Sequence, residues 1–247
     1  GRGRNPPLTT TKGLLMATIK VIDVISRVEA ILQDTNVRWP RLELQKWLNE
    51  SYLSIVLLRP DANAVCATFT CAAGTKQVLT ASSGGFPSAL RLLDITRNVL
   101  SSSNKKVVRV VARSVLDDQR PSWHAETQSA NIQHYTYDPR NPKQFYVYPP
   151  ATNTAELEVV YADAPGSHSL TEADLDPAGS NTEVIKLDDT YLSPITDWVL
   201  YRAYSKDAEY GANEQRASAA FQTFNAAIGA KTQVDAAVSP TPRSSVT

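Results

Sequence analysis

The order of hydrophobic patterns along the chain limits its fold more than any other feature. Apolar residues recur at helical spacing near both ends of the sequence, in residues 19–58 and 188–230. Between these segments the pattern changes to short alternating runs, separated by turns that contain proline and glycine. Three- and four-residue spacing marks one face of a helix, whereas alternation is typical of half-buried strands. The sequence therefore predicts an α+β protein in which a helical bundle, formed by an N-terminal and a C-terminal helix pair, carries an inserted antiparallel β-rich domain.

The first helix pair is expected in residues 16–62. Its first helix, residues 19–33, has apolar residues at four- and three-residue spacing on one face. The second helix begins at Trp39-Pro40, because proline suits the first helical position, and it stops before Pro60. The apolar faces of the two helices consist of Val21, Ile25, Val28 and Leu32, and of Leu44, Trp47, Leu48, Ser51, Ile55 and Leu58.

The second helix pair is expected in residues 188–234. Gly211 is suited to end the first of these helices and Asn213 to cap the next one, which we expect to stop at Gly229. Asp188-Asp189 precede the pair, where acidic side chains can cap unsatisfied backbone N–H groups. The apolar faces of the pair consist of Leu192, Ile195, Val199 and Ala203, next to Arg202, and of Ala217, Ala220, Phe221, Phe224 and Ile228.

The β-rich domain is expected in residues 63–187. Residues 90–99 fit either a helix or a strand, because Leu92 and Val99 suit a helical face while the β-branched content allows a strand. Short strands between turns with proline and glycine indicate a sandwich or a small barrel. The other strands are expected at residues 65–70, 76–80, 106–111, 133–137, 144–148 and 157–161.

The two ends of the chain are expected to lie outside these domains. We expect the natural start at Met16, so that residues 1–15 are a leader or a cloning-derived extension, and they lack the apolar stretch of a secretory signal. Residues 235–247 contain too little apolar surface to fold alone. We therefore expect these last residues to form an extended C-terminal arm.

Composition excludes some classes of protein. The chain has 247 residues, of which 42% are hydrophobic, and this is enough to build a core. Its 25 Lys and Arg balance 25 Asp and Glu, so the formal net charge is zero. Strong non-specific attraction to nucleic acid or to an anionic membrane is therefore not expected. No apolar run approaches the roughly 20 residues that a membrane span needs, so we expect no membrane association.

Neither cysteine nor histidine predicts a metal site or a cofactor. Cys66 and Cys71 could form a disulfide or half of a zinc site, but no His or further Cys lies nearby, and we favour two small apolar side chains. His124, His134 and His168 lack the spacing of metal ligands, and we expect them on the surface or in turns.

Two groups of residues leave a binding role open. Lys105, Lys106, Arg109 and Arg113 form the one local basic cluster, which suits either a surface that binds a nucleic-acid backbone or, as we prefer, an edge strand protected by charge. The tyrosines of the β segments suit either stacking on sugars and bases or, as we prefer, cross-strand packing. These tyrosines are Tyr135, Tyr137, Tyr146, Tyr148 and Tyr161.

Three stretches together resemble the head-to-tail adaptor, or connector, proteins of short-tailed bacteriophages, similar to the tubular tail adaptor. The first is VIDVISRVEAILQDTNVRWPRLELQKWLNES with the following IVLLRPDA, within residues 21–62. The second is YDPRNPKQFYVYPP, residues 137–150, and the third is DWVLYRAYSKDAEYGANEQRASAAFQTFNAAIG, residues 197–229. Their order and spacing carry the resemblance, which extends from Met16 to Gly229.

The resemblance implies a structural protein of the virion at the head–tail junction, without enzymatic activity. Such adaptors form a homo-oligomeric ring, usually of twelve subunits, beneath the portal protein and above the tail nozzle or tube. Genomic DNA passes through the ring without sequence-specific binding. In this family C-terminal segments commonly reach the portal, and we therefore expect the arm to bind it through Ala236, Val238, Pro240, Pro242, Arg243 and the residues up to Thr247.

Two other classes of function compete with this interpretation. A carbohydrate- or nucleic-acid-binding β module with helical support would use the tyrosines and the basic cluster. An enzyme, such as a hydrolase, would use Asp188, Asp189 and His168, but the sequence contains no visible pair of nucleophile and base.

Overall fold

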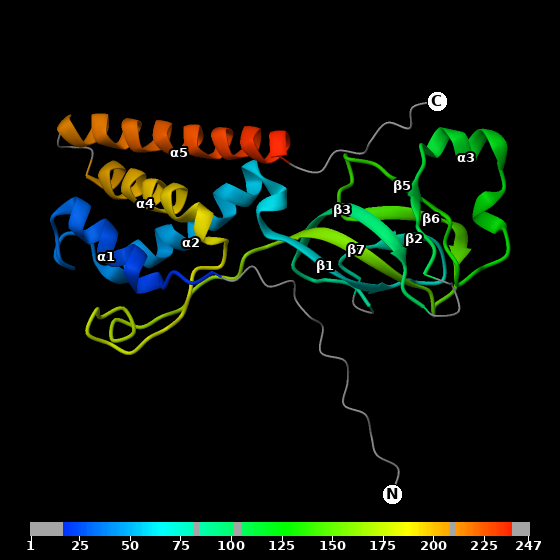
Figure 1. Ribbon diagram of the computed structural model, residues 1–247, viewed down its shortest axis with the longest axis horizontal. Helices are drawn as coiled ribbons and strands as arrows, with labels where there is room; N and C mark the ends of the chain where they lie inside the picture. Colours follow the sequence, from blue (N-terminus) through cyan, green and yellow to red (C-terminus); the bar gives the residue numbers. More distant parts are fainter. Residues whose placement is uncertain (1–16, 82–83, 101–104, 208–210, 239–247) are drawn as a thin grey trace, which may run out of the picture. The chain divides into compact units, whose positions relative to one another are not determined.

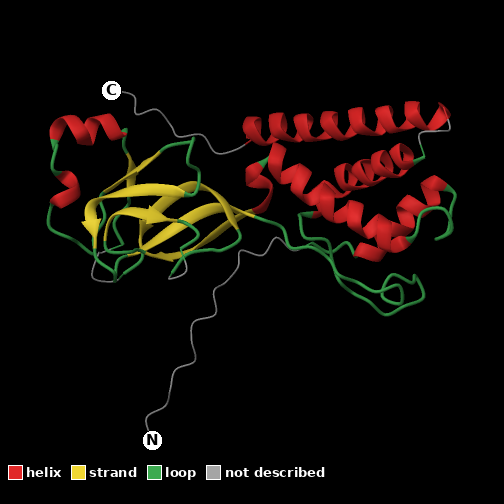
Figure 2. Ribbon diagram, turned by 180° about the vertical axis from the view of Figure 1, so that it is seen from behind, coloured by secondary structure: helices red, strands yellow, loops and turns green. Residues whose placement is uncertain are grey.

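The strands lie in one part of the chain and the four long helices in another (Figure 2). A computed structural model describes residues 17–81, 84–100, 105–207 and 211–238. It divides the described chain into two compact units, a β-rich unit of residues 63–164 and a helical unit of residues 17–62 and 165–238. The α+β class is therefore confirmed, with the strands inserted between helices from both sides of the sequence.

The helical unit contains α1 (Val21–Leu32), α2 (Arg41–Leu58), α4 (Leu192–Lys206) and α5 (Gly211–Val238) (Figure 1). Helix α4 packs against each of the other three, so helices from both sides of the insertion share one interior. The Trp39 indole donates to the Ala203 carbonyl at 3.1 Å and ties the start of α2 to α4. All predicted stripe residues of α1 and α2 are buried except Leu32, which is half-buried, and Leu58, which is 52% exposed.

A charged pair also joins the first two helices. Arg41 at the start of α2 donates through Nε and Nη2 to the two carboxylate oxygens of Glu29 in α1, at 2.7 and 3.3 Å. Both side chains are about nine-tenths buried. A two-point contact of this kind fixes the direction of both side chains as well as their distance.

The ends of α4 and α5 differ from the predictions. Helix α4 ends at Lys206, before the expected Gly211, and α5 begins at Gly211. Helix α5 also continues through Gly229 to Val238, because the alanine-rich sequence around that glycine favours a helix. The prediction of an extended arm from residue 235 is therefore wrong for Ala236 and Val238, which are helical. The helix ends two residues before Pro240, and the residue before a proline disfavours helical geometry.

The β-rich unit contains two sheets. The first has the antiparallel order β1-β7-β3, built from β1 (Ala64–Thr70), β7 (Glu156–Asp163) and β3 (Ala89–Asn98). The ambiguous residues 90–99 thus form a strand. The second has the order β2-β6-β5-β4, where β4 pairs parallel to β5. Its strands are β2 (Gly74–Val78), β6 (Gln144–Ala151), β5 (His134–Tyr137) and β4 (Arg109–Val110), and α3 (Arg113–Gln119) follows β4.

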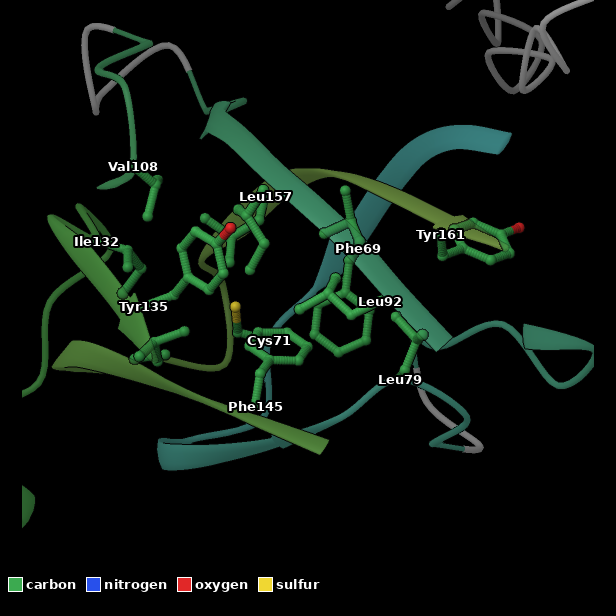
Figure 3. Packing of buried hydrophobic residues seen from close by; sticks show 14 of the residues in the cluster. Phe69, Cys71, Leu79, Leu92, Val108, Ile132, Tyr135, Phe145, Leu157 and Tyr161 are labelled. Carbon is green, nitrogen blue, oxygen red and sulfur yellow. The ribbon is translucent and has the colours of Figure 1, made fainter. Parts of the chain in front are cut away.

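One hydrophobic core lies between the two sheets (Figure 3). The ring of Phe69 in β1 meets the ring of Phe145 in β6 edge to face, with centroids 5.5 Å apart. Residues 106–111 pass from one sheet to the other, since Val108 N donates to Thr96 O and Arg109 N to Gln133 O. The sheets do not close into a barrel, so that alternative is wrong, and the second sheet is mixed rather than purely antiparallel.

Residues 165–187, predicted to be part of the β-rich domain, belong to the helical unit. Gln45 of α2 and the backbone of Leu170 exchange two hydrogen bonds of 2.8 and 3.3 Å. Val184 pairs with Lys20 in an isolated antiparallel bridge. These contacts attach residues 165–187 to the helical unit. Alternation of apolar residues along the sequence does not indicate such contacts.

Candidate functional site

The predicted portal arm lies mostly beyond the described residues. Ala236 and Val238 are in the last turn of α5, as described above. Pro240, Pro242 and Arg243 fall within residues 239–247, outside the part of the chain that the structure describes.

The basic cluster lies along the transition from the first sheet to α3. Lys106 and Arg109 line a hollow of about 310 Å³ together with Asn131, Gln133 and His134. Arg109 and His134 are paired residues of the parallel strands β4 and β5, so their side chains share one face of the sheet. Burial lowers the pKa of His134, and the positive charge of Arg109 lowers it further. The hollow therefore combines two cations with a neutral imidazole.

A second hollow, of about 540 Å³, lies at the other end of β5. It is lined by Arg113 at the start of α3, by Tyr137 and Tyr146, and by the β5–β6 turn. The guanidinium of Arg113 lies 5.7 Å from the centre of the Tyr146 ring, a cation–π distance. Asp138 and Arg140 form an ion pair within the turn, and the Arg140 guanidinium lowers the pKa of the Asp138 carboxyl.

The five tyrosines divide between core and surface. Tyr135, Tyr148 and Tyr161 are buried, at 6 to 7% exposure, and serve packing. The hydroxyl of Tyr135 also donates to Asp94 at 2.9 Å. Only Tyr137 and Tyr146, both half-buried, line the second hollow. A stacking role can thus involve no more than these two of the five rings.

His168 is buried, contrary to the prediction of a surface or turn histidine. Its Nε2 lies 2.8 Å from the Tyr52 hydroxyl, and its Nδ1 lies 2.6 Å from Glu183 Oε1. Lys186 Nζ donates to the same Glu183 oxygen at 2.8 Å. No local pattern in the sequence indicates this network, because 116 residues separate Tyr52 from His168.

The residues proposed for a hydrolase make separate contacts. His168 bonds to Tyr52 and Glu183 rather than to Asp188 or Asp189. Asp188 accepts the Thr190 N–H at the start of a short 3-10 turn, as expected of a capping residue. Asp189 accepts the backbone N–H groups of Thr18 and Ile19 at 2.9 and 3.2 Å. Of the three residues, Asp189 is the one that holds the backbone just before α1.

Both cysteines carry free thiols, which contradicts the disulfide alternative. Cys71 is buried and burial raises its pKa to about 12, whereas Cys66 is exposed. Within the described residues, no three His, Cys, Asp or Glu side chains gather closely enough to hold a metal ion. In the same part of the chain, no helix has the length and apolar character required to cross a membrane.

Comparison with known proteins identifies a family. A family model described as the SU10 adaptor protein matches residues 19–244 and so includes segments of both compact units. No curated protein matches the chain. The family match confirms the resemblance to phage head-to-tail adaptors that the three sequence stretches indicated. The chain therefore belongs to the SU10 adaptor protein family.

Proposed function

We propose that this protein is a structural head-to-tail adaptor of a bacteriophage virion. Twelve copies form a ring beneath the portal, join it to the tail nozzle and surround the channel through which DNA leaves the head. The family match is the observation that carries the proposal, because it extends over residues 19–244 rather than over one motif. The protein acts in this role through contacts and not as an enzyme.

Exposed leucines of α2 support contacts between neighbouring copies. Leu53, Leu57 and Leu58 are 56%, 82% and 52% exposed and lie in the last two turns of that helix. Neighbouring apolar side chains in water are typical of surfaces that another protein covers. A ring requires that this surface meet a different surface of the next copy.

The portal contact is assigned to residues 239–247, with α5 as its helical base. This segment contains Pro240, Pro242 and Arg243, and its low apolar content suits ordering upon a partner. Ala236 and Val238, which precede this segment, lie in the last turn of α5.

Truncation after Val238 tests the portal contact. We expect the shortened chain to fold and stay soluble, because every element of both units is retained, but to lose retention by an immobilised portal ring. A chain in which residues 239–247 are replaced by glycine and serine serves as the control for length. Unchanged retention of either variant would contradict the assignment. Mass measurement of the full chain alone and after mixing with portal rings then tests ring formation directly.

The second hollow favours one alternative, a β module that binds carbohydrate or nucleic acid. Tyr146, Tyr137 and Arg113 supply rings and a cation there. Titration with oligosaccharides and with single-stranded DNA separates the two functions, since we expect an adaptor to bind neither. We also expect the wall of the DNA channel to be neutral or acidic. Basic residues there would bind each phosphate with roughly 1 kcal/mol and would slow the passage of DNA.

A further inference from the structure

The segment around β4 is an exposed edge of the second sheet. β4 is the last strand in the order β2-β6-β5-β4. Val110 lies on this strand and Val107 two residues before its start, and they are 65% and 68% exposed. Two exposed β-branched residues three positions apart are typical of a segment that another chain covers.

The backbone of β4 offers hydrogen bonds on this side. Arg109 N donates to Gln133 O at 3.1 Å and Val111 N donates to Tyr135 O at 2.9 Å, so both N–H groups point toward β5. N–H groups of successive residues in a strand alternate in direction, and that of Val110 therefore points away from the sheet. The next outward group towards β3, Val108 N, already donates to Thr96 O, so Val110 is the position at which the backbone of an additional strand can attach.

Polar atoms beside the edge also lack partners. Asn131 Oδ1 and His134 Nδ1, in the first hollow, are buried and have no hydrogen bond with any described residue. The hydroxyl of Tyr137, in the second hollow, has none either among the residues described. Such atoms are costly to leave unsatisfied, so a ligand that supplies hydrogen bonds at both ends of β5 is favoured.

The positive charge beside β4 favours an incoming strand that is acidic. Lys106 and Arg109 are exposed and form no ion pair within the described part of the chain. Like charges oppose pairing of this edge with the same edge of a second copy. Carboxylates on an incoming strand would instead be attracted to both residues.

We propose that an extended, acidic segment of a partner protein adds a strand to β4, with its backbone on Val110 and its carboxylates on Lys106 and Arg109. A polypeptide supplies N–H donors for the unpartnered acceptors and apolar side chains for the exposed valines. A phosphodiester backbone supplies acceptors only, and the net charge of zero gives DNA little long-range attraction. The inference goes beyond the proposed function, since it concerns a surface of the β-rich unit and not the portal arm.

A proline substitution at this edge tests the strand addition. Val110→Pro removes the outward N–H but leaves the donors of Arg109 and Val111 to β5 intact. Leu79 N donates to Lys143 O, so the N–H of Val78 in β2 points outward at the opposite edge of the same sheet. Val78→Pro is therefore the matched control.

Binding is measured by fluorescence anisotropy with the full chain and a labelled short peptide of alternating glutamate and valine. We expect Val110→Pro to weaken binding at least about tenfold and Val78→Pro to leave it unchanged. The double variant Lys106→Gln, Arg109→Gln should weaken it about fivefold and needs no change of backbone. Thermal unfolding verifies that each variant is folded.

Three outcomes would overturn the inference. One is equal binding of a peptide with lysine in place of glutamate. Another is unchanged affinity for both the Val110→Pro variant and the double variant. The third is binding of a short DNA duplex with no binding of the acidic peptide. Portal retention is a separate measurement that does not depend on peptide binding. Failure of the strand addition is therefore distinguishable from failure of the adaptor proposal.

Discussion

A single buried ring holds a long loop against α2. The Tyr52 hydroxyl accepts the Lys186 N–H at 3.3 Å and lies 2.8 Å from His168 Nε2, to which it donates its own hydrogen. His168 Nδ1 then carries the proton that the Glu183 carboxylate accepts, and the ring is neutral. Burial lowers the pKa of His168 more than the nearby carboxylate raises it, in agreement with this neutral state.

The neutral ring makes stability depend on pH. In the unfolded chain the histidine takes up a proton near its usual pKa of about 6.5, whereas the folded environment resists protonation. The unfolded state therefore binds more protons at low pH, and we expect the free energy of unfolding to fall as pH decreases from about 7 to about 5. His168→Gln should reduce this fall, as measured by urea unfolding at both pH values. His124→Gln, which alters an exposed ring, is the control, and equal pH dependence in all three proteins would refute the prediction.

At the scale of elements, aromatic side chains attach α5 to α4. Phe224 of α5 is 1% exposed and its ring centroid lies 5.1 Å from that of Trp198 in α4. Phe221, one turn earlier, lies 5.0 Å from Tyr201 but is 40% exposed. The two phenylalanines thus contact the same helix with different burial, and burial sets the contribution of each to stability.

Substitution of each phenylalanine tests this difference. We expect Phe224→Ala to lower the free energy of unfolding by about 3–5 kcal/mol, because it leaves a cavity between the helices. Phe221→Ala removes a partly solvated ring and should cost about 1 kcal/mol or less. Urea unfolding followed by circular dichroism measures both. Similar losses in the two variants would show that the contact, and not burial, dominates.

At the scale of the whole molecule, the chain builds two units with separate interiors. The β-rich unit is centred on residues such as Phe145, which is fully buried between the sheets. The helical unit encloses residues such as Ile195 of α4, which is equally buried. The β-rich unit is continuous in sequence, whereas the helical unit is assembled from both sides of it.

Separate interiors predict separate responses to a core mutation. Phe145→Ala should destabilise the β-rich unit by about 3–5 kcal/mol through the cavity it leaves. Amide hydrogen exchange followed by mass spectrometry should then show faster exchange in residues 63–164 and unchanged protection in α1, α2, α4 and α5. Loss of protection throughout both units would show that they unfold as one.

The sequence alone determined the features that depend on local periodicity. Spacing along a few turns or pleats predicts the α+β order and the apolar faces of α1 and α2. It also predicts the strands around Phe69, Phe145 and Leu157. The family resemblance also followed from stretches of sequence, and the family match confirms it. Local reasoning failed at Gly229, where the helix-forming residues around a glycine outweighed its cost.

Only the tertiary structure decided which distant residues meet. It joined Tyr52 to His168 and Glu183, placed residues 165–187 on the helices, and brought Arg109 beside His134 at the edge of an open sheet. These contacts depend on how elements pack and on which backbone groups stay unpaired. A buried polar group can form its hydrogen bond with a residue from any part of the chain. Periodicity along the sequence therefore cannot predict which residue that is.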